Sequence, residues 1–143
     1  MPADTVLNTT PDEAAVKAAV IEFHAALNAM FSGDLKPMEA IWSHTSDVLY
    51  RGTGGEYRIG WQQVRAEWIK QAAQKLGGWV KPIEIHIVAD ESLAVVGNYV
   101  KGQNFDDEGN PMEVFLRVSS LFCKESGQWK MIGLHTHLLP FSV

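Results

Sequence analysis

The second half of the sequence, from residue 79 onward, contains strand signals separated only by short turns. The stretches WVKPIEIHIVAD, LAVVGNYVKGQNF, MEVFLRVSSLFCKE and WKMIGLHTHLLP alternate side chains between two faces, as half-buried strands do. The connecting segments ADES, DDEGNP and SGQ carry the acidic, polar and glycine residues that are typical of turns. This pattern predicts four long antiparallel strands.

Three helices are predicted ahead of these strands. Thr10 is placed to cap the first helix, Pro11 stands at its first position, and Gly33 is placed to end it. A short helix follows in LKPMEAIWS, and a third in WQQVRAEWIKQAAQKLGG stops at Gly77 and Gly78. Helices followed by antiparallel strands define the α+β class.

The rest of the chain fits one domain. Residues 46–52 (SDVLYRG) predict a short strand, and the following TGGEYRI predicts a loop. We expect a flexible tail over residues 1–10 and a single domain over residues 11–143, because a chain of this length buries enough surface for one core. No internal repeat or domain boundary is visible.

Charge and cysteine content exclude several classes of protein. Acidic residues outnumber basic residues by 17 to 12, the formal net charge is −5, and no segment concentrates lysine and arginine, so nucleic acid is not an expected partner. Cys123 is the only cysteine, which rules out an intrachain disulfide and a CxxC site. No apolar run approaches roughly 18 residues, and the N-terminus lacks the features of a signal peptide. We therefore expect a cytoplasmic protein without a membrane partner.

Three segments, taken in order, resemble the nuclear transport factor two-like superfamily: FSGDLKPMEAIWSHTSDVLY, GWQQVRAEW and GQWKMIGLHTHLLP. The last is most similar to the SnoaL-like branch and to the association domain of calcium/calmodulin-dependent protein kinase II, in which His135 and Pro140 have counterparts. The resemblance spans residues 11–140. It implies a strongly curved antiparallel sheet wrapped around three helices as a cone, with a pocket inside the cone and a homodimer formed through the back of the sheet.

The superfamily includes ketosteroid isomerases, whose proton transfer needs a tyrosine on the first helix and a carboxylate on the short strand. At the matching positions this sequence has Ala26 and Arg51. Alanine cannot donate a proton, and a guanidinium is not a base at neutral pH. Isomerisation by that mechanism is therefore not expected.

Strict alternation assigns the side chains of each strand to one of two faces. In the strand that begins at residue 79, one face carries Trp79, Lys81, Ile83, Ile85 and Ile87. We expect the opposite face of that strand to be the more exposed. In the terminal strand, one face carries Trp129, Met131, Gly133, His135 and His137.

Polar side chains interrupt the last two strands. Arg117 lies in an otherwise apolar strand, where a buried guanidinium would need a carboxylate, a ligand anion or water beside it. The SnoaL-like resemblance implies that Arg117 points into the cone. For His135 and His137 three interpretations stay open, namely metal ligands, polar groups on the pocket wall, or histidines at a wet strand edge.

We therefore hypothesise a SnoaL-like domain that binds a small hydrophobic or carboxylate-bearing molecule in an enclosed, mainly apolar pocket. The expected ligand-binding residues are Tyr50, Trp68, Tyr99, Arg117, His135 and His137. Any catalysis would be acid–base chemistry without cofactor or metal, with His135 as proton carrier and Arg117 stabilising an anion. Whether the domain is an enzyme stays open. The alternatives are a non-catalytic homodimerisation or ligand-sensing module and a histidine-based metal-binding protein.

Overall fold

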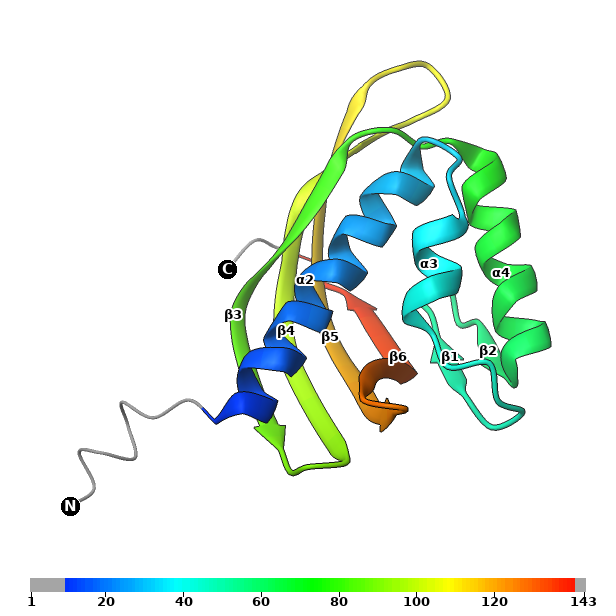
Figure 1. Cartoon of the computed structure of the whole chain (residues 1–143). Helices are drawn as coiled ribbons and strands as arrows, with labels where there is room; N and C mark the ends of the chain where they lie inside the picture. The colour runs from blue at the N-terminus through cyan, green and yellow to red at the C-terminus, as the bar shows by residue number, and fades with distance from the viewer. Residues whose placement is uncertain (1–9, 141–143) are drawn as a thin grey trace.

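The computed structural model describes residues 10–140. The helices are α2 (Pro11–Phe31), α3 (Lys36–Ile41) and α4 (Trp61–Gln74), and the strands are β1 (Leu49–Arg51), β2 (Tyr57–Ile59), β3 (Trp79–Ala89), β4 (Leu93–Phe105), β5 (Pro111–Glu125) and β6 (Gln128–Leu138). One six-stranded sheet, in the order β2-β1-β6-β5-β4-β3, curves around the helices, and α2 lies along its concave face (Figure 1). The expected α+β cone is confirmed.

Local sequence sets the two ends of α2. The Thr10 hydroxyl accepts a hydrogen bond from the Glu13 backbone N–H at 3.1 Å, and Pro11 occupies the first turn, where a missing N–H does no harm. Gly33 follows the last turn at φ +96°, a conformation that favours glycine. The predicted helix is confirmed. Of the expected tail over residues 1–10, all but Thr10 lies outside the described residues.

The four long strands pair antiparallel as predicted, β3 with β4, β4 with β5 and β5 with β6. The other edge of the sheet differs from the expectation. Residues 57–59, predicted as a loop, form β2, which pairs antiparallel with β1 through Leu49 and Ile59. β1 pairs in turn with β6, and this pairing is parallel, with Tyr50 opposite Leu134.

A β-bulge in β6 changes the phase of its side chains. Phe122 of β5 is opposite Met131, but the preceding residue of β5, Leu121, is opposite Gly133. Ile132 is therefore an extra residue in β6. Because side chains alternate along a strand, those before and after Ile132 are out of phase.

The bulge makes the predicted faces of β6 wrong. Trp129 is buried in the core before the bulge, whereas Leu134 and Thr136 face the helices after it. His135 and His137 consequently lie on the convex face of the sheet, although strict alternation placed them on the same face as Trp129.

A bulge between Ile83 and His86 has the same effect in β3. Val80, expected on the more exposed face, is 4% exposed, whereas Trp79 is 47% exposed. Beyond the bulge, Ile87 packs against the core as predicted. The face assignment of β3 is thus wrong before the bulge and correct after it.

The core lies between the concave face of the sheet and the helices. Its largest fully buried side chains include Trp42 and Trp68, whose rings lie 5.8 Å apart. Contrary to the expectation from the sequence, α2 is long and apolar enough to cross a membrane by length and composition alone. Core helices meet the same criterion, and the packing of α2 against the sheet accounts for its apolar face.

Candidate functional site

The helices and the concave face of the sheet surround a cavity of about 370 Å³. Small-molecule sites typically measure roughly 300–1,000 Å³ and have mainly apolar walls. Most of this wall is aliphatic or aromatic and includes Phe23, Leu27, Val100, Leu116, Val118 and Leu134. We therefore take this space, the cone cavity, as the candidate site.

Polar side chains gather on one part of the wall. The polar cluster consists of Tyr50 of β1, Glu56 of the β1–β2 turn, Glu67 and Gln71 of α4, and Thr136 of β6. The Gln71 Nε2 group donates to Glu67 Oε2 at 3.2 Å and to the Tyr50 hydroxyl oxygen at 3.4 Å. Gln71 thereby connects the helix to the sheet across the cavity wall.

Glu67 is a buried carboxylate with defined partners. Its side chain is 5% exposed, and Oε1 forms an ion pair with Arg58 Nη2 at 3.3 Å. The Arg58 side chain is 38% exposed and lies outside the cavity wall. A buried carboxylate needs compensating partners, and Arg58 and Gln71 together supply them.

Tyr50 is 6% exposed, and burial raises the pKa of its hydroxyl. The negative charges of Glu56 and Glu67 raise this pKa further. Hydrogen bonding with Gln71 and with Thr136 lowers this pKa without reversing the shift. The hydroxyl therefore keeps its proton at neutral pH, and its oxygen accepts a hydrogen bond from Gln71 Nε2 at 3.4 Å.

Gly52 allows two of these groups to converge. A Cβ atom at residue 52 would overlap both the Tyr50 hydroxyl and the Glu56 carboxylate. The Glu56 carboxylate also accepts a hydrogen bond from the Gly54 N–H at 3.0 Å. The turn between β1 and β2 thus positions Glu56 beside Tyr50 at the cavity wall.

Two of the six expected ligand-binding residues line the cone cavity. Tyr50 and Trp68 are on its wall, and their rings lie 4.7 Å apart. The other four do not line it and lie on the convex face: Tyr99, Arg117, His135 and His137.

The position of Arg117 follows from alternation along β5. Leu116 and Val118 line the cavity, so Arg117 points away from it and is exposed. A guanidinium in water needs no buried partner. The expectation that Arg117 points into the cone was therefore wrong.

The two histidines belong to a convex cationic group, defined here as Arg51, Arg117, His135 and His137. Arg51 is opposite His135 and Arg117 is opposite His137, and the two imidazole centroids lie 4.7 Å apart. Desolvation lowers the pKa of His135, and the charges of the other three members lower it further. Within residues 10–140, no group of three or more His, Cys, Asp or Glu side chains is arranged to hold a metal ion.

Sequence reasoning missed most of the polar cluster. Glu67 and Gln71 are four residues apart and border the apolar stripe that contains Trp68, so this spacing was the available signal. Glu56 lies in a segment that was predicted only as a loop. Thr136 was not predicted to line the cavity because the bulge in β6 moves its side chain to the opposite face of the strand.

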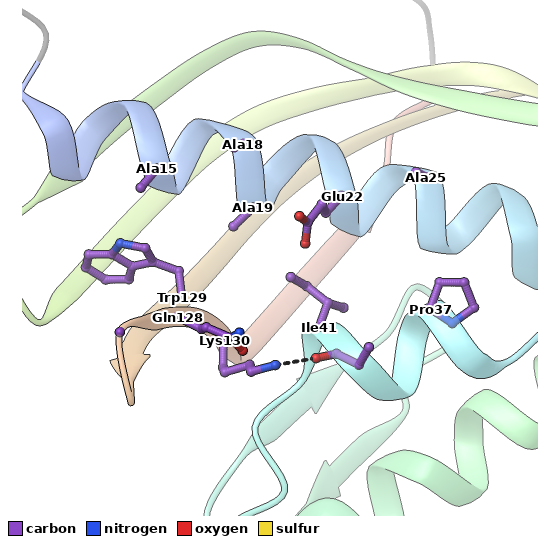
Figure 2. Close-up of a pocket in the computed structure, with 12 residues that line it drawn as sticks. Ala15, Ala18, Ala19, Glu22, Ala25, Pro37, Ile41, Gln128, Trp129 and Lys130 are labelled. Carbon is purple, nitrogen blue, oxygen red and sulfur yellow. Dashed lines mark hydrogen bonds between the residues drawn. The ribbon is translucent and has the colours of Figure 1, made fainter.

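A second hollow lies outside the cone, between α2, α3 and the turn from β5 to β6 (Figure 2). It measures about 630 Å³, and alanine side chains of α2 form much of its wall. Its charged lining residues are Glu22 and Lys130, and Lys130 Nζ donates to the Ala40 carbonyl oxygen at 2.7 Å. This wall offers little chemistry, so the cone cavity stays the candidate site.

Solved structures share this fold at low sequence identity. A candidate dehydratase of the nuclear transport factor two-like family from Streptomyces avermitilis is similar with a TM-score of 0.77 at 16% identity, over 90% of this chain and 97% of that one. A candidate calcium/calmodulin-dependent protein kinase II association domain from Xanthomonas campestris has a TM-score of 0.71 at 18% identity, over 94% of this chain and 91% of that one. A candidate ketosteroid isomerase from Shewanella frigidimarina has a TM-score of 0.67 at 18% identity, over 85% of this chain and 94% of that one.

At these identities the likeness shows the fold alone. No curated protein matches the sequence. A family model described as the SnoaL-like domain matches residues 16–138, which is most of the chain. The protein therefore belongs to the SnoaL-like domain family.

Proposed function

We propose that this SnoaL-like domain binds a small molecule in the cone cavity. The apolar wall holds the body of the molecule, and the polar cluster holds its polar group. The observation that carries the proposal is the convergence of a buried carboxylate, Glu67, and a buried hydroxyl, Tyr50, on one part of an otherwise apolar cavity. Such fixed polar groups orient a ligand within an apolar site.

The same two residues support acid–base chemistry without a cofactor. Tyr50 retains its proton and can donate a hydrogen bond to an oxygen that becomes negative during the reaction. Glu67 is a carboxylate that can accept a proton, and an ion pair and an amide hold its two oxygens in place. These residues replace His135 and Arg117 as proposed proton carrier and anion-stabilising group, because the latter two do not line the cavity.

Filling the cavity tests the binding site. Leu116→Trp enlarges a side chain on the cavity wall, whereas Leu121→Trp makes the same change on the same strand at a convex position that is 42% exposed. Native mass spectrometry of each protein, before and after denaturation, detects a small molecule that leaves with the fold. We expect such a molecule in the wild type and in Leu121→Trp but not in Leu116→Trp. Equal retention by all three proteins would contradict a site in the cone.

A second function, assembly, is supported by the convex face. Val88, Val95, Leu121 and Gly133 lie opposite one another across β3, β4, β5 and β6. The first three are 62%, 53% and 42% exposed. A contiguous apolar row of this kind marks an interaction surface, and we propose that a second copy of the chain covers it to form a homodimer through the back of the sheet.

Sedimentation velocity at micromolar concentration tests this assembly. We expect the wild type to sediment as a dimer and Val95→Glu as a monomer, because the substitution places a charge in the middle of the apolar row. Ile21→Glu is the matched control, since Ile21 is equally exposed at 53% but lies on α2. A monomeric wild type would argue against this second function.

A further inference from the structure

The charges around the cone cavity are unevenly exposed. Its charged lining residues are Glu56, Glu67 and Lys70. Glu67 is buried, whereas Lys70 is exposed and Arg58, the ion-pair partner of Glu67, is 38% exposed and lies outside the wall. Water screens an exposed cation strongly and a buried carboxylate weakly. A molecule in the cavity therefore meets the negative side of the ion pair.

The hydrogen-bonding groups of the polar cluster restrict the ligand as well. The Tyr50 hydroxyl has a proton to donate, and the Glu67 carboxylate can only accept. A ligand hydroxyl satisfies both, because it accepts from Tyr50 and donates to Glu67. A ligand carboxylate accepts only, and it would bring a third negative charge beside Glu56 and Glu67. The same two glutamates contribute to the raised pKa of Tyr50, which shows their influence at this wall.

We infer that the molecule bound in the cone is a small apolar alcohol, with a neutral hydroxyl at the polar cluster and no negative charge. This inference rests on the proposed binding function and narrows the class expected from the sequence, because it removes carboxylate-bearing molecules. The residue that sets this preference for an uncharged ligand is Glu67, because it is buried, its ion pair fixes its position, and its carboxylate lines the cavity.

Two probes that share the same apolar body and differ in their polar group test the inference: 1-adamantanemethanol and 1-adamantanecarboxylate. Isothermal titration calorimetry at pH 7 with the wild-type protein should show the alcohol binding at least roughly ten-fold more tightly than the carboxylate. If the carboxylate binds as tightly as the alcohol or more tightly, the cavity is a binding site and the inference alone is overturned. If neither probe binds, the proposed function fails, and the inference fails with it.

Glu67→Gln tests which residue sets the preference. Glutamine keeps the size and hydrogen bonding of the side chain but removes the charge, so the carboxylate probe should gain roughly ten-fold in affinity relative to the alcohol. Glu108→Gln removes the same charge from the exposed β4–β5 turn and should leave the ratio unchanged. An unchanged ratio in a folded Glu67→Gln protein would overturn the role of Glu67. Glu56→Gln provides a second variant at the same wall should Glu67→Gln fail to fold.

Discussion

The two faces of the single sheet carry opposite chemistry. The concave face contributes Tyr50 to an apolar cavity, where a buried carboxylate from α4, Glu67, lies close by. The convex face carries the convex cationic group beside a row of exposed apolar side chains. Neighbouring residues of one strand therefore belong to different sites. The position of a residue in the alternation of its strand, rather than its type, decides on which face its side chain lies.

The largest expected effect comes from deleting Ile132, which removes the bulge that sets this phase in β6. Without it, β6 either loses its pairing or turns His135 and His137 into the cone and Leu134 outward. Burying two imidazoles and exposing a core leucine should lower the free energy of unfolding by more than about 4 kcal/mol. Urea denaturation followed by circular dichroism measures this loss.

Deleting Asp107, in the exposed turn between β4 and β5, is the control for removing one residue. It should cost far less stability, because turns accept changes of length. Similar losses from the two deletions would show that the bulge does not determine the faces of β6.

Placing an arginine on each face of β5 gives the next largest effect. Val118 is 3% exposed and lines the cavity, whereas Ser119 is exposed on the convex face. Val118→Arg should destabilise by about 3–5 kcal/mol because it buries an unpaired charge, and Ser119→Arg by less than about 1 kcal/mol. Urea denaturation of both variants measures the difference. Equal destabilisation would mean that both faces are covered to the same extent.

Ligand affinity should depend on the concave face alone. Tyr50→Phe removes the hydroxyl that can donate a hydrogen bond to the ligand and should weaken binding of 1-adamantanemethanol by roughly ten-fold, about 1.4 kcal/mol. Arg117→Ala and His135→Ala should leave the affinity within about two-fold, because both residues lie on the convex face. Titration calorimetry compares the three variants. A large effect of Arg117→Ala would place a ligand on the convex face instead.

The smallest expected effect is a pH dependence that separates a core histidine from a convex one. Burial lowers the pKa of His24 below its usual value of 6.5, and the hydrogen bond to the Val20 carbonyl oxygen at 2.8 Å offsets part of this shift. As the pH falls, the unfolded chain takes up this proton before the folded one does. The stability associated with His24 is therefore complete above pH 6.5 and declines as the pH drops through the lower folded pKa.

Urea denaturation between pH 8 and pH 5 should reveal this decline in the wild type. His24→Leu should remove much of it, and His135→Gln only a little, because His135 is less buried although its pKa is lowered as well. The same decline in His24→Leu as in the wild type would assign the pH dependence to other groups.

Local signals made the helices and the long strands predictable from the sequence. The Thr10 cap, the Pro11 start and the turns between strands act over a few residues, and the structure has each of them where it was expected. β2 pairs locally with β1 and is only three residues long, too short for an alternation to be visible. The parallel pairing of β1 with β6, in contrast, depends on contacts between segments far apart in the chain. No periodicity reports such contacts.

The candidate site was predictable only where strand phase was known. Tyr50 and Trp68 do line the cone cavity, and the sequence signals for this were a short strand and an apolar helix stripe. His135 and His137 were misplaced because Ile132, the bulge residue, resembles any other strand residue. Glu67 was missed because a carboxylate on a helix is usually exposed, whereas here Arg58 and Gln71 compensate its burial.

From the parallel pairing of β1 with β6 we also expect an order in which the strands pair during folding. The contacts of β3 with β4 and of β4 with β5 join segments that are close in sequence, so they can form early. Tyr50 gains its neighbour Thr136 only when β1 pairs with β6, and that pairing closes a long loop of chain. The polar cluster therefore combines groups that only this long-range pairing brings together.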